Sequence, residues 1–465
     1  MQPATKDTNY PQYREIPYCE PFTAFAPFAD EIGAVLIDCP IESESSRYAY
    51  VCAHPQRVIT AKNSLVTVDK LSSSSTYEAN PFDLMRQTLT DYHQTTLPEL
   101  PPFQGGMAGF LSYDLSHNLE ELPRAEDDMQ FPDLCLGVYD VVLAFDVKEQ
   151  RAWVVVNGYP EGNYDKSWEK AEQMLSKLCS AYPTLQALPQ PVDLASNFPD
   201  RDSYERSIQQ VIDYILEGDI FEANLTRRLQ GNMPDNITEY QLYGLLRQYN
   251  PAPFACYMNF GETKIASSSP ERFIKLNNGL AETFPIKGTR PRGKTPADDD
   301  RLAQELVQSE KDRAENLMIV DLMRNDFSRV CLPGTVKTPE VCGLYSFATV
   351  HHLISKVEGR LCPGVGPIEL LEATFPGGSI TGAPKIRAME IIAELEPTAR
   401  GPYCGSAGFI GFDGNMDTNI LIRTFAIKDK RICFQAGGAI VLDSDPEEEY
   451  DETDHKFAAL KKVLG

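Results

Sequence analysis

Residues 136–156 read LGVYDVVLAFDVKEQRAWVVV, and this stretch indicates the kind of sheet that the chain forms. Two apolar runs, Leu136 to Phe145 and Arg151 to Val156, flank the polar turn Lys148-Glu149-Gln150. Runs rich in β-branched and aromatic residues on either side of a polar turn are typical of a β-hairpin. From Ser406 onward the chain again alternates short β-rich runs with polar turns, which predicts an antiparallel meander.

A helix is predicted between these two β-rich regions. Apolar residues from Tyr204 to Ile215 follow the 3.6-residue period of one helix face. Asp202 or Ser203 is the expected N-cap, because both side chains can accept a hydrogen bond from the first turn. Gly218 is expected to end the helix, since glycine adopts the left-handed conformation of a C-cap without strain.

The boundary between two regions is predicted just before this helix. Pro189 to Pro199 is a polar, proline-containing stretch, and such composition favours a linker. We therefore expect a β-rich N-terminal region over residues 1–190 and a second region over residues 200–465, closely packed as one structural unit. After the helix, apolar and polar residues alternate, so Glu222 is expected to face away from the apolar side of a strand.

Composition limits the classes of protein to consider. The 465 residues are 42% hydrophobic, enough for a large core. No stretch approaches the ~18 apolar residues of a membrane span and the N-terminus lacks an apolar leader, so a cytosolic location is expected. Eleven cysteines without a C-x-x-C pair argue against a disulfide framework and a zinc site. A net charge of -24 disfavours nucleic acid and anionic membranes as partners.

The segment Pro285-Ile286-Lys287-Gly288-Thr289 is the strongest candidate for chemistry. A lysine becomes a nucleophile only when burial or a neighbouring cation lowers its pKa. Arg290 and Arg292 follow Lys287 at once, and we expect them to act in this way. The same arginines would attract an anionic substrate to an otherwise acidic chain. The simpler alternative is a solvated surface lysine.

Two acidic pairs occur at helical spacing. Ser309 is expected to cap a helix on which Asp312 and Glu315 share one face, and a second predicted helix carries Glu449 and Glu452. Like charges three residues apart destabilise a helix by roughly 0.2–0.5 kcal/mol unless a cation neutralises them. Mg²⁺ suits this role because it prefers carboxylate oxygens. Solvated helix faces are the alternative interpretation.

A phosphate-binding loop is an alternative that the residues disfavour. Residues 288–295 satisfy the pattern of such a loop, and residues 317–321 imitate its acidic partner strand. However, Pro291 removes a backbone donor, and Pro296 with three aspartates follows where phosphate and helix should lie. The apolar run at residues 317–321 is also expected to continue a helix. We therefore do not expect nucleotide hydrolysis.

Several segments resemble the chorismate-utilising enzymes in order and spacing. The resemblance covers most of the chain, most strongly from about Arg201 to Lys461. It implies an α+β fold in which two stacked antiparallel sheets are flanked by helices, with the active site between them. The segments are Pro102-Phe103-Gln104-Gly105-Gly106, Ser112-Tyr113-Asp114, Ser267-Ser268-Ser269-Pro270-Glu271-Arg272-Phe273, Pro285 to Thr289, Ala314-Glu315-Asn316, Asp321-Leu322-Met323-Arg324-Asn325-Asp326 and Gly382-Ala383-Pro384-Lys385.

The resemblance also implies a reaction. Lys287 is similar to the lysine of members that form 4-amino-4-deoxychorismate, whereas anthranilate-forming members carry alanine there. The implied reaction uses Mg²⁺ and ammonia from a separate glutamine amidotransferase, on the route to 4-aminobenzoate and folate. Lys287 would add at C2 of chorismate as the C4 hydroxyl leaves, and ammonia would then attack C4 and expel the lysine. Anthranilate formation is the nearest alternative, and a non-catalytic amino-acid sensor is one of another class.

The family's functional positions fall on residues of this chain. Glu271 matches the general acid, which needs a pKa raised by burial, and His352 matches the active-site histidine. Glu315 and Glu452 match the Mg²⁺ ligands, with Asp312 and Glu449 next to them. The positions expected to bind substrate are Gly288, Thr289, Ser379, Tyr403, Arg423, Gly437, Gly438 and Lys456.

One further site and two departures follow from the same resemblance. Asp38, Ser46, Arg47 and Tyr48 correspond to a tryptophan pocket of feedback-regulated relatives. Glu222 stands where ammonia-using members carry glutamine and isochorismate-forming members a water-activating lysine. Ala439 stands where a third glycine is usual, and its methyl group would narrow the pocket for a substrate carboxylate.

Overall fold

Two antiparallel β-sheets of 12 strands each form the centre of the fold. The computed structural model describes residues 10–41, 46–70, 73–160, 162–178, 189–347 and 350–465. In order across the first sheet, the strands are β1 (Gln12–Ile16), β10 (Arg151–Val156), β9 (Val141–Asp146), β3 (Tyr48–Cys52), β2 (Ala34–Asp38), β13 (Phe254–Phe260), β14 (Thr263–Ser269), β23 (Thr424–Lys428), β24 (Arg431–Ile440), β12 (Glu222–Asn232) and β11 (Ala195–Ser196), and β20 (Gly382–Ala383) also pairs with β12.

The second sheet is built in the same way. Its strands, in order, are β17 (Ile286–Pro291), β19 (Val350–Arg360), β16 (Leu280–Thr283), β15 (Arg272–Asn277), β22 (Met416–Ile420), β21 (Ser406–Gly411), β7 (Gly106–Leu111), β8 (Leu134–Tyr139), β4 (Arg57–Lys62), β5 (Leu65–Lys70) and β6 (Ser73–Glu78), and β18 (Lys337–Ser346) also pairs with β19. One core cluster combines Val35 and Cys256 of the first sheet with Phe110 and Ala407 of the second, so the sheets pack face to face. This confirms the expected α+β class.

Both regions of the chain contribute strands to both sheets. In the first sheet Leu36 of β2 pairs with Tyr257 of β13. In the second sheet Gly109 of β7 pairs with Gly408 of β21. Strands from before and after residues 189–199 are therefore hydrogen-bonded to each other at the middle of each sheet.

The predicted hairpin is confirmed between β9 and β10, where Val142 pairs with Val155. The run from Leu136 to Phe145 is not one strand, however, because β8 belongs to the second sheet and β9 to the first. The chain passes from one sheet to the other at buried Asp140. The Asp140 carboxylate accepts hydrogen bonds from Ser167 Oγ and Lys170 Nζ, both at 2.5 Å. A run that is buried on both faces hides this break, since its composition does not change there.

Helices cover the outer faces of the sheets. The predicted helix is α4, and it begins earlier than expected: Asp200 is the N-cap, and its side chain accepts from the Ser203 backbone in a capping box. Gly218, with φ of 87°, ends it as predicted. The helices are α1 (Pro21–Phe25), α2 (Pro81–Asp91), α3 (Tyr164–Lys177), α4 (Arg201–Glu217), α5 (Glu239–Tyr249), α6 (Pro296–Gln308), α7 (Glu310–Ser328), α8 (Pro367–Thr374), α9 (Lys385–Leu395) and α10 (Pro446–Val463), with 3₁₀ turns η1 (Ala26–Phe28), η2 (Tyr113–Asn118) and η3 (Gly378–Ile380).

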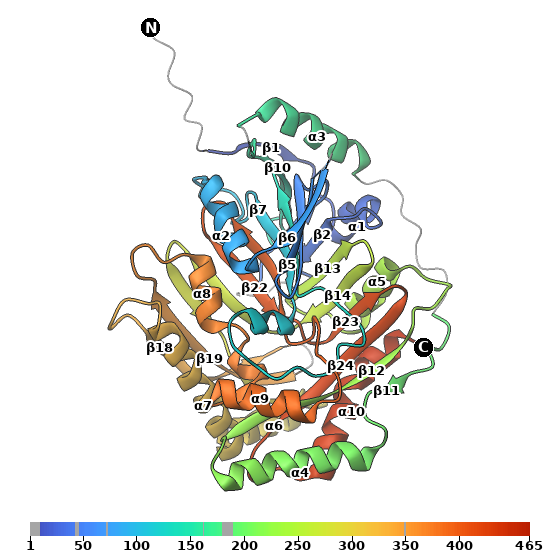
Figure 1. Cartoon of the computed structure of the whole chain (residues 1–465), viewed down its shortest axis with the longest axis vertical. Helices are drawn as coiled ribbons and strands as arrows, with labels where there is room; N and C mark the ends of the chain where they lie inside the picture. The colour runs from blue at the N-terminus through green and yellow to red at the C-terminus, as the bar shows by residue number, and fades with distance from the viewer. Residues whose placement is uncertain (1–9, 42–45, 71–72, 161, 179–188, 348–349) are drawn as a thin grey trace.

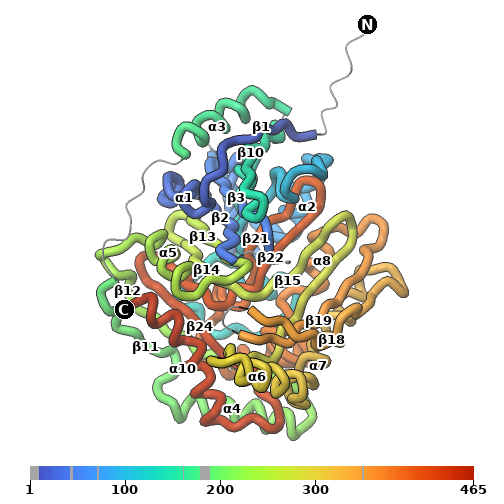
Figure 2. The backbone as a smooth tube through the Cα atoms, turned by 180° about the vertical axis from the view of Figure 1, so that it is seen from behind, coloured from blue at the N-terminus to red at the C-terminus, as the bar shows by residue number. Residues whose placement is uncertain are grey.

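Different helices lie at the two ends of the long axis of the molecule. Figure 1 shows α3 and β1 at one end and α4, α6 and α10 at the other. Helix α10 packs on β24 between α4 and α5, as Figure 2 shows from behind. Helices α6 and α7 pack on β17 and β19 of the other sheet. Helices α7 and α10, which carry the predicted metal ligands, thus lie towards the same end as α4.

Two expectations from composition can be compared with the structure. The ten cysteines in the described ranges form no disulfide with one another, and most are buried. Within those ranges, no helix combines the length and the apolar character needed to span a bilayer.

Candidate active site

Lys287 lies on β17 and reaches across to the first sheet. Its Nζ is 2.9 Å from Oε1 of Glu222 at the start of β12, and the two side chains are 11% and 0% exposed. Burial favours the neutral amine, but the carboxylates of Glu222 and Glu315 favour the ammonium more strongly, so the pKa of Lys287 is raised. This corrects the expectation that its pKa would be lowered.

The two arginines expected to lower that pKa have other partners. Arg290 pairs with Asp312 at 3.0 Å, and Arg292 pairs with Asp299 at 2.6 Å. Their positive charges are therefore neutralised by the helices that follow β17. In this structure Lys287 is held as a buried ammonium beside Glu222.

Glu271 lies between β14 and β15 and is 6% exposed. Its Oε1 accepts a hydrogen bond of 2.8 Å from Ser379 Oγ of η3. Burial raises the pKa of Glu271 to about 7, although the Ser379 hydrogen bond and the Lys287 charge both lower it. The pKa of Glu271 is thus shifted in the expected direction, and Ser379 is in contact with its carboxyl group.

A bulge brings Thr289 to His352. The register between β17 and β19 shifts between Lys287 and Thr289, and Gly288 between them has φ of 81°. A Cβ at Gly288 would lie 2.9 Å from the side chains of Asp312 and Leu306, so only glycine fits there. Thr289 Oγ1 is 2.9 Å from His352 Nδ1. Burial and the nearby Arg423 charge lower the pKa of His352 to about 4, so its ring is neutral at pH 7.

Arg423 provides a positive charge without an acidic partner. It follows β22, has φ of 51°, and is partly buried near His352. No carboxylate in the described part of the chain forms an ion pair with it, and burial lowers its pKa. An unpaired guanidinium suits bidentate binding of a substrate carboxylate. Tyr403 is also buried, and burial raises the pKa of its hydroxyl well above the ordinary value.

The two acidic helices face a common positive charge. Glu315 lies on α7, whose N-cap is Ser309 as predicted, and Glu449 and Glu452 lie on α10. Burial raises the pKa of Glu315 to about 7, and burial and Glu452 raise the pKa of Glu449. Lys311 acts on all three carboxylates from α7. Lys311 was not predicted, although its position four residues before Glu315 was a signal that could have shown it.

Three of the four predicted metal ligands, Asp312, Glu449 and Glu452, are engaged in other contacts. Asp312 pairs with Arg290, and Glu449 accepts from Ser444 Oγ at 2.7 Å. Glu452 pairs with Lys456 at 2.6 Å. Lys456 also donates to the Gly437 carbonyl at 2.7 Å. As the side chains stand, no three carboxylate, imidazole or thiol groups among the described residues gather as a metal site.

Gly438 keeps the space beside α10 open. A Cβ at this position would lie 2.9 Å from Glu449 Oε2, 3.8 Å from Glu452 Oε1 and 3.9 Å from Lys456 Nζ. Gly437 and Gly438 pair with Thr226 and Leu225 of β12, in the strand that begins with Glu222. The glycines therefore connect the Lys287–Glu222 pair with the acidic face of α10.

In the segment with the phosphate-loop pattern, a side chain of the protein accepts the backbone hydrogen bond that a phosphate would need. The Gly293 backbone donates to Asp299 Oδ1 at 2.7 Å, in the place that a phosphate would need. A helix does follow, contrary to expectation, because Thr295 caps α6 at Pro296. Residues 317–321 lie within α7, as predicted.

A separate cavity of about 220 Å³ is lined by all four residues of the predicted amino-acid pocket. Asp38 accepts hydrogen bonds from Tyr243 and Arg247, and Arg47 is paired with Asp146. Arg272, next to Glu271 in the sequence, lines the same cavity. Strand β15 thus adjoins both this cavity and Glu271.

Comparison with known proteins gives one family and two activities within it. Residues 38–462 match the family model described as chorismate binding enzyme. The chain is 40% identical to aminodeoxychorismate synthase component 1 of Escherichia coli (strain K12), over 90% of each protein. It is 34% identical to anthranilate synthase component 1 of Acetivibrio thermocellus, over 96% of this chain and 92% of the relative. Its structure is similar to that of anthranilate synthase component I from Streptococcus pneumoniae, with a TM-score of 0.80 and 32% identity over 90% of this chain and 93% of that one.

Proposed function

The chain belongs to the family of chorismate-binding enzymes, and on this premise we propose that it is an aminodeoxychorismate synthase component I, which converts chorismate and ammonia to 4-amino-4-deoxychorismate. The proposal rests on the presence of a buried lysine, Lys287, in the candidate site. It is a buried amine within 2.9 Å of Glu222 and close enough to Glu271 and Glu315 for their charges to act on its pKa. Anthranilate-forming members have alanine at this position and so lack a nucleophile there.

Lys287 must lose a proton before it can attack, because its pKa is raised. Glu222 is the carboxylate in hydrogen-bond contact with Nζ, and it takes this proton. The amine then adds to C2 of chorismate, the ring double bonds shift, and the C4–O bond breaks. Glu271 gives its proton to the departing hydroxyl, which leaves as water.

Ammonia completes the reaction. It attacks C4, the double bonds shift back, and the bond from C2 to Lys287 breaks. Lys287 recovers its proton from Glu222, and the new ammonium at C4 returns a proton to Glu271. The net change is replacement of hydroxyl by amine with release of water, and all three side chains end in their starting states.

The substrate is held by cationic and neutral groups around Lys287. Arg423 supplies the guanidinium for a carboxylate, and Gly437 and Gly438 allow close approach of backbone N–H groups. Neutral His352 and Thr289, hydrogen-bonded to each other, orient the ring from β17 and β19. Tyr403 and Lys456 complete the set.

The acidic helices fit Mg²⁺ by their chemistry. Glu315 and Glu452 would hold the ion, with Asp312 and Glu449 beside them, since carboxylate oxygens are its preferred ligands. The raised pKa values of partly buried Glu315 and buried Glu449 support carboxylates that a cation would stabilise, and Gly438 leaves space next to Glu449 and Glu452. Bound there, Mg²⁺ would neutralise a substrate carboxylate.

The proposal includes a partner and a second ligand. The names of the relatives refer to a component 1, which supports a separate glutamine amidotransferase as the source of ammonia.

The reduced thiols support a cytoplasmic location. The cavity lined by Asp38, Ser46, Arg47 and Tyr48 is proposed to bind tryptophan. Retention of Lys287 and Glu271 in one site argues against a non-catalytic sensor.

The test is identification of the product. Purified chain is incubated with chorismate, Mg²⁺ and ammonium, and the products are separated with and without an aminodeoxychorismate lyase. We expect 4-amino-4-deoxychorismate from the wild type and its loss in Lys287→Ala, with 2-amino product permitted by the vacated space. Lys287→Arg should also be inactive, because guanidinium stays protonated. Mass spectrometry after trapping should find the adduct on Lys287.

Lys356→Ala is the matched control. Lys356 lies on β19 and pairs with Glu282 and Glu358 outside the site, so its loss should leave the product unchanged. Anthranilate as the wild-type product would reject the proposal in favour of the anthranilate-forming activity. Full C4 amination by Lys287→Ala would reject the covalent mechanism.

A further inference from the structure

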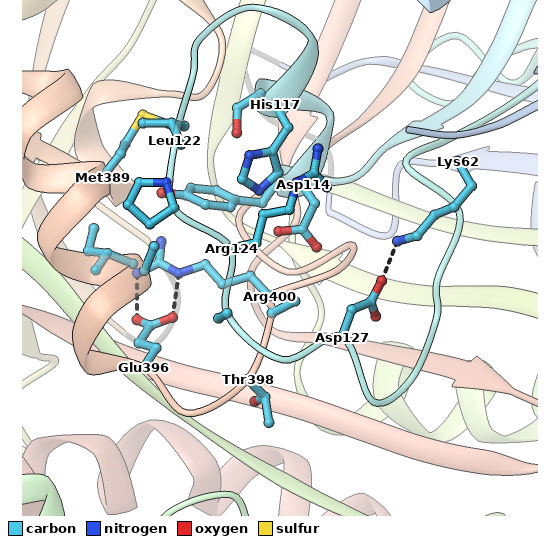
Figure 3. A pocket seen from close by; sticks show the side chains of 17 residues that line it. Lys62, Asp114, His117, Leu122, Arg124, Asp127, Met389, Glu396, Thr398 and Arg400 are labelled. Carbon is cyan, nitrogen blue, oxygen red and sulfur yellow. Dashed lines mark hydrogen bonds and ion pairs between the residues drawn. The ribbon is translucent and has the colours of Figure 1, made fainter. Parts of the chain in front are cut away.

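A buried ion pair contacts the backbone of two segments that carry residues of the candidate active site. Glu396 follows α9, and Arg400 lies four residues later; their side chains are 3% and 2% exposed. Arg400 Nε donates to Glu396 Oε2 at 2.9 Å and Nη2 donates to Oε1 at 2.7 Å. Figure 3 shows this pair on one side of a cavity of about 70 Å³, opposite the ion pair of Lys62 and Asp127. Neither residue of the Glu396–Arg400 pair touches the reacting groups.

The guanidinium of Arg400 joins two backbone segments that carry site residues. Nη1 donates to the Ile380 carbonyl at 2.9 Å, and Nη2 donates to the Asn224 carbonyl at 2.6 Å. Ile380 directly follows Ser379, the donor to Glu271. Asn224 lies two residues after Glu222 on β12. One side chain thus fixes the distance between the turn that holds the acid and the strand that holds the partner of Lys287.

Glu396 and the Arg400 backbone extend this arrangement to a third segment. Glu396 Oε1 accepts from Thr226 N and Thr226 Oγ1, both at 2.9 Å, two residues further along β12. Gln435 Nε2 donates to the Arg400 carbonyl at 2.8 Å, and Gln435 lies two residues before Gly437 on β24. The Tyr113 ring covers the guanidinium at 4.6 Å. Strands β12 and β24 and turn η3 therefore meet at this pair.

The chemistry of the pair favours a positioning role over simple stabilisation. Two buried charges pay a large desolvation cost, and a well-packed apolar pair of the same size is often as stable or more so. What an apolar pair cannot supply is a rigid planar fork that donates in several directions at once. Arg400 uses that fork to hold Glu396 and two carbonyl groups from different segments.

We propose that the Glu396–Arg400 pair is a positioning element of the active site, which sets the Ser379 hydroxyl against Glu271 and Glu222 against Lys287. The proposal rests on the proposed function, since it concerns the same reaction. It assigns no contact with substrate to either residue. Its consequence is that the proton affinity of Glu271 depends on a side chain that does not touch it, through Ile380 and Ser379.

The test is Arg400→Lys, which keeps the positive charge but replaces the planar guanidinium, with its several fixed N–H donors, by an ammonium group. The Ser379 hydrogen bond lowers the pKa of Glu271, so a displaced Ser379 should let that pKa rise. We expect kcat to fall at least about 10-fold with KM for chorismate changed less than about 3-fold. The alkaline limb of the pH profile of kcat/KM should move to higher pH. Ser379→Ala should give the same movement of the limb by a direct route.

A milder variant and a control keep the test decisive. Thr226→Val removes the Oγ1 hydrogen bond to Glu396 with little change of shape, and it should move the limb in the same direction by less. It carries the test if Arg400→Lys does not fold. Lys170→Met breaks the buried pair of Lys170 and Asp140 in the N-terminal region. That variant should lower thermal stability and leave the pH profile at its wild-type position.

Two results would overturn the positioning role. One is a wild-type pH profile and kcat in both Arg400→Lys and Thr226→Val, even with reduced thermal stability, because the pair would then serve the fold alone. The other is a shift of equal size in Lys170→Met. The profile is measured on whichever amino product the wild type forms, so a wrong assignment of the product leaves this test intact.

Discussion

Burial favours the neutral form of both Lys287 and Glu271, yet only the pKa of Glu271 shifts in the direction that burial favours. At Glu271 burial outweighs the opposing effects of the Ser379 hydrogen bond and the Lys287 charge, so its pKa rises to about 7. Lys287 is surrounded by Glu222, Glu315 and Glu271, so it stays charged. In the proposed mechanism Glu271 can therefore act as the acid without a prior proton transfer, whereas Lys287 must first give a proton to Glu222.

The raised pKa of Glu271 predicts a conflict between function and stability. Its folded-state pKa of about 7 exceeds the ordinary value of 4.5, so the folded protein binds more protons than the unfolded chain between these values. Stability should fall as pH rises from about 4.5 to 7 and stay reduced above. Glu271→Gln removes this cost, which by the pKa difference is up to about 3 kcal/mol. We expect an inactive variant that melts at higher temperature than wild type at pH 8.

The comparison at low pH is the control for this prediction. At pH 4.5 wild-type Glu271 is protonated in the folded state, so Glu271→Gln should melt within experimental error of wild type after allowance for the amide. Glu358→Gln, which removes an ion pair with Lys356 on β19 outside the site, is measured at both pH values as the matched variant. A constant difference in melting temperature at both pH values would contradict the assigned burial penalty.

How far the sequence could predict the site is seen in these same residues. The raised pKa of Glu271 was expected from the family resemblance, because Glu271 matches a general acid, and not from its local sequence. The charge state of Lys287 was not predictable, because Glu222 lies 65 residues away in the chain and Asp312 and Asp299 take up Arg290 and Arg292. Local sequence shows which charges are adjacent, but it does not show which are already paired.

At the scale of elements, periodicity located the helices and strands better than their ends. Helix α4 and its Gly218 terminus followed from pattern and cap, but the capping box at Asp200 lay before the residues that the pattern favoured. The run through Asp140 contains two strands of two sheets, and no change of hydrophobicity marks the crossing. Only the crossing at Asp140 depends on partners distant in sequence, namely the other sheet and the α3 side chains Ser167 and Lys170. The cap at Asp200 is local, because its partner Ser203 is three residues away.

The facing helices α7 and α10 predict how metal affinity should respond to single changes. Glu315→Gln and Glu452→Gln keep shape but remove one negative charge from each helix, so we expect at least a 10-fold rise in the Mg²⁺ concentration for half-maximal activity. Calorimetric titration of Mg²⁺ in the presence of chorismate should show the same loss of affinity. Because burial already raises the pKa of Glu315 to about 7, affinity in the wild type should also weaken below that pH.

Glu305→Gln is the matched control for the metal prediction. Glu305 lies on neighbouring α6, exposed and paired with Arg301, so its charge should not affect the titration. Unchanged Mg²⁺ dependence in both Glu315→Gln and Glu452→Gln would remove these two helices as the metal site.

At the scale of the whole molecule, the site depends on both sheets at once. Lys287 comes from the second sheet and Glu222 from the first, and strands of the N-terminal region complete each sheet through β2–β13 and β7–β21 pairing. Sequence composition indicated a linker near residues 189–199 but contains no signal for this interleaving, because strand order is set by long-range pairing. The net charge of -24 is likewise compatible with an anionic substrate only because Arg423 and Lys287 are placed locally.

The last prediction concerns the nitrogen source. We expect the amide chemistry of glutamine to reside in a separate protein, because the names of the relatives refer to a component 1. With glutamine alone the purified chain should show no turnover, and ammonium should restore it. At fixed total ammonium the rate should rise with pH as free NH₃ increases. At fixed free NH₃ the rate should instead fall above pH of about 7, because Glu271 loses its proton there. The opposite pH dependence of the two rates distinguishes the supply of free NH₃ from the loss of the Glu271 proton. Glutamine-dependent turnover by the purified chain would refute the need for a partner.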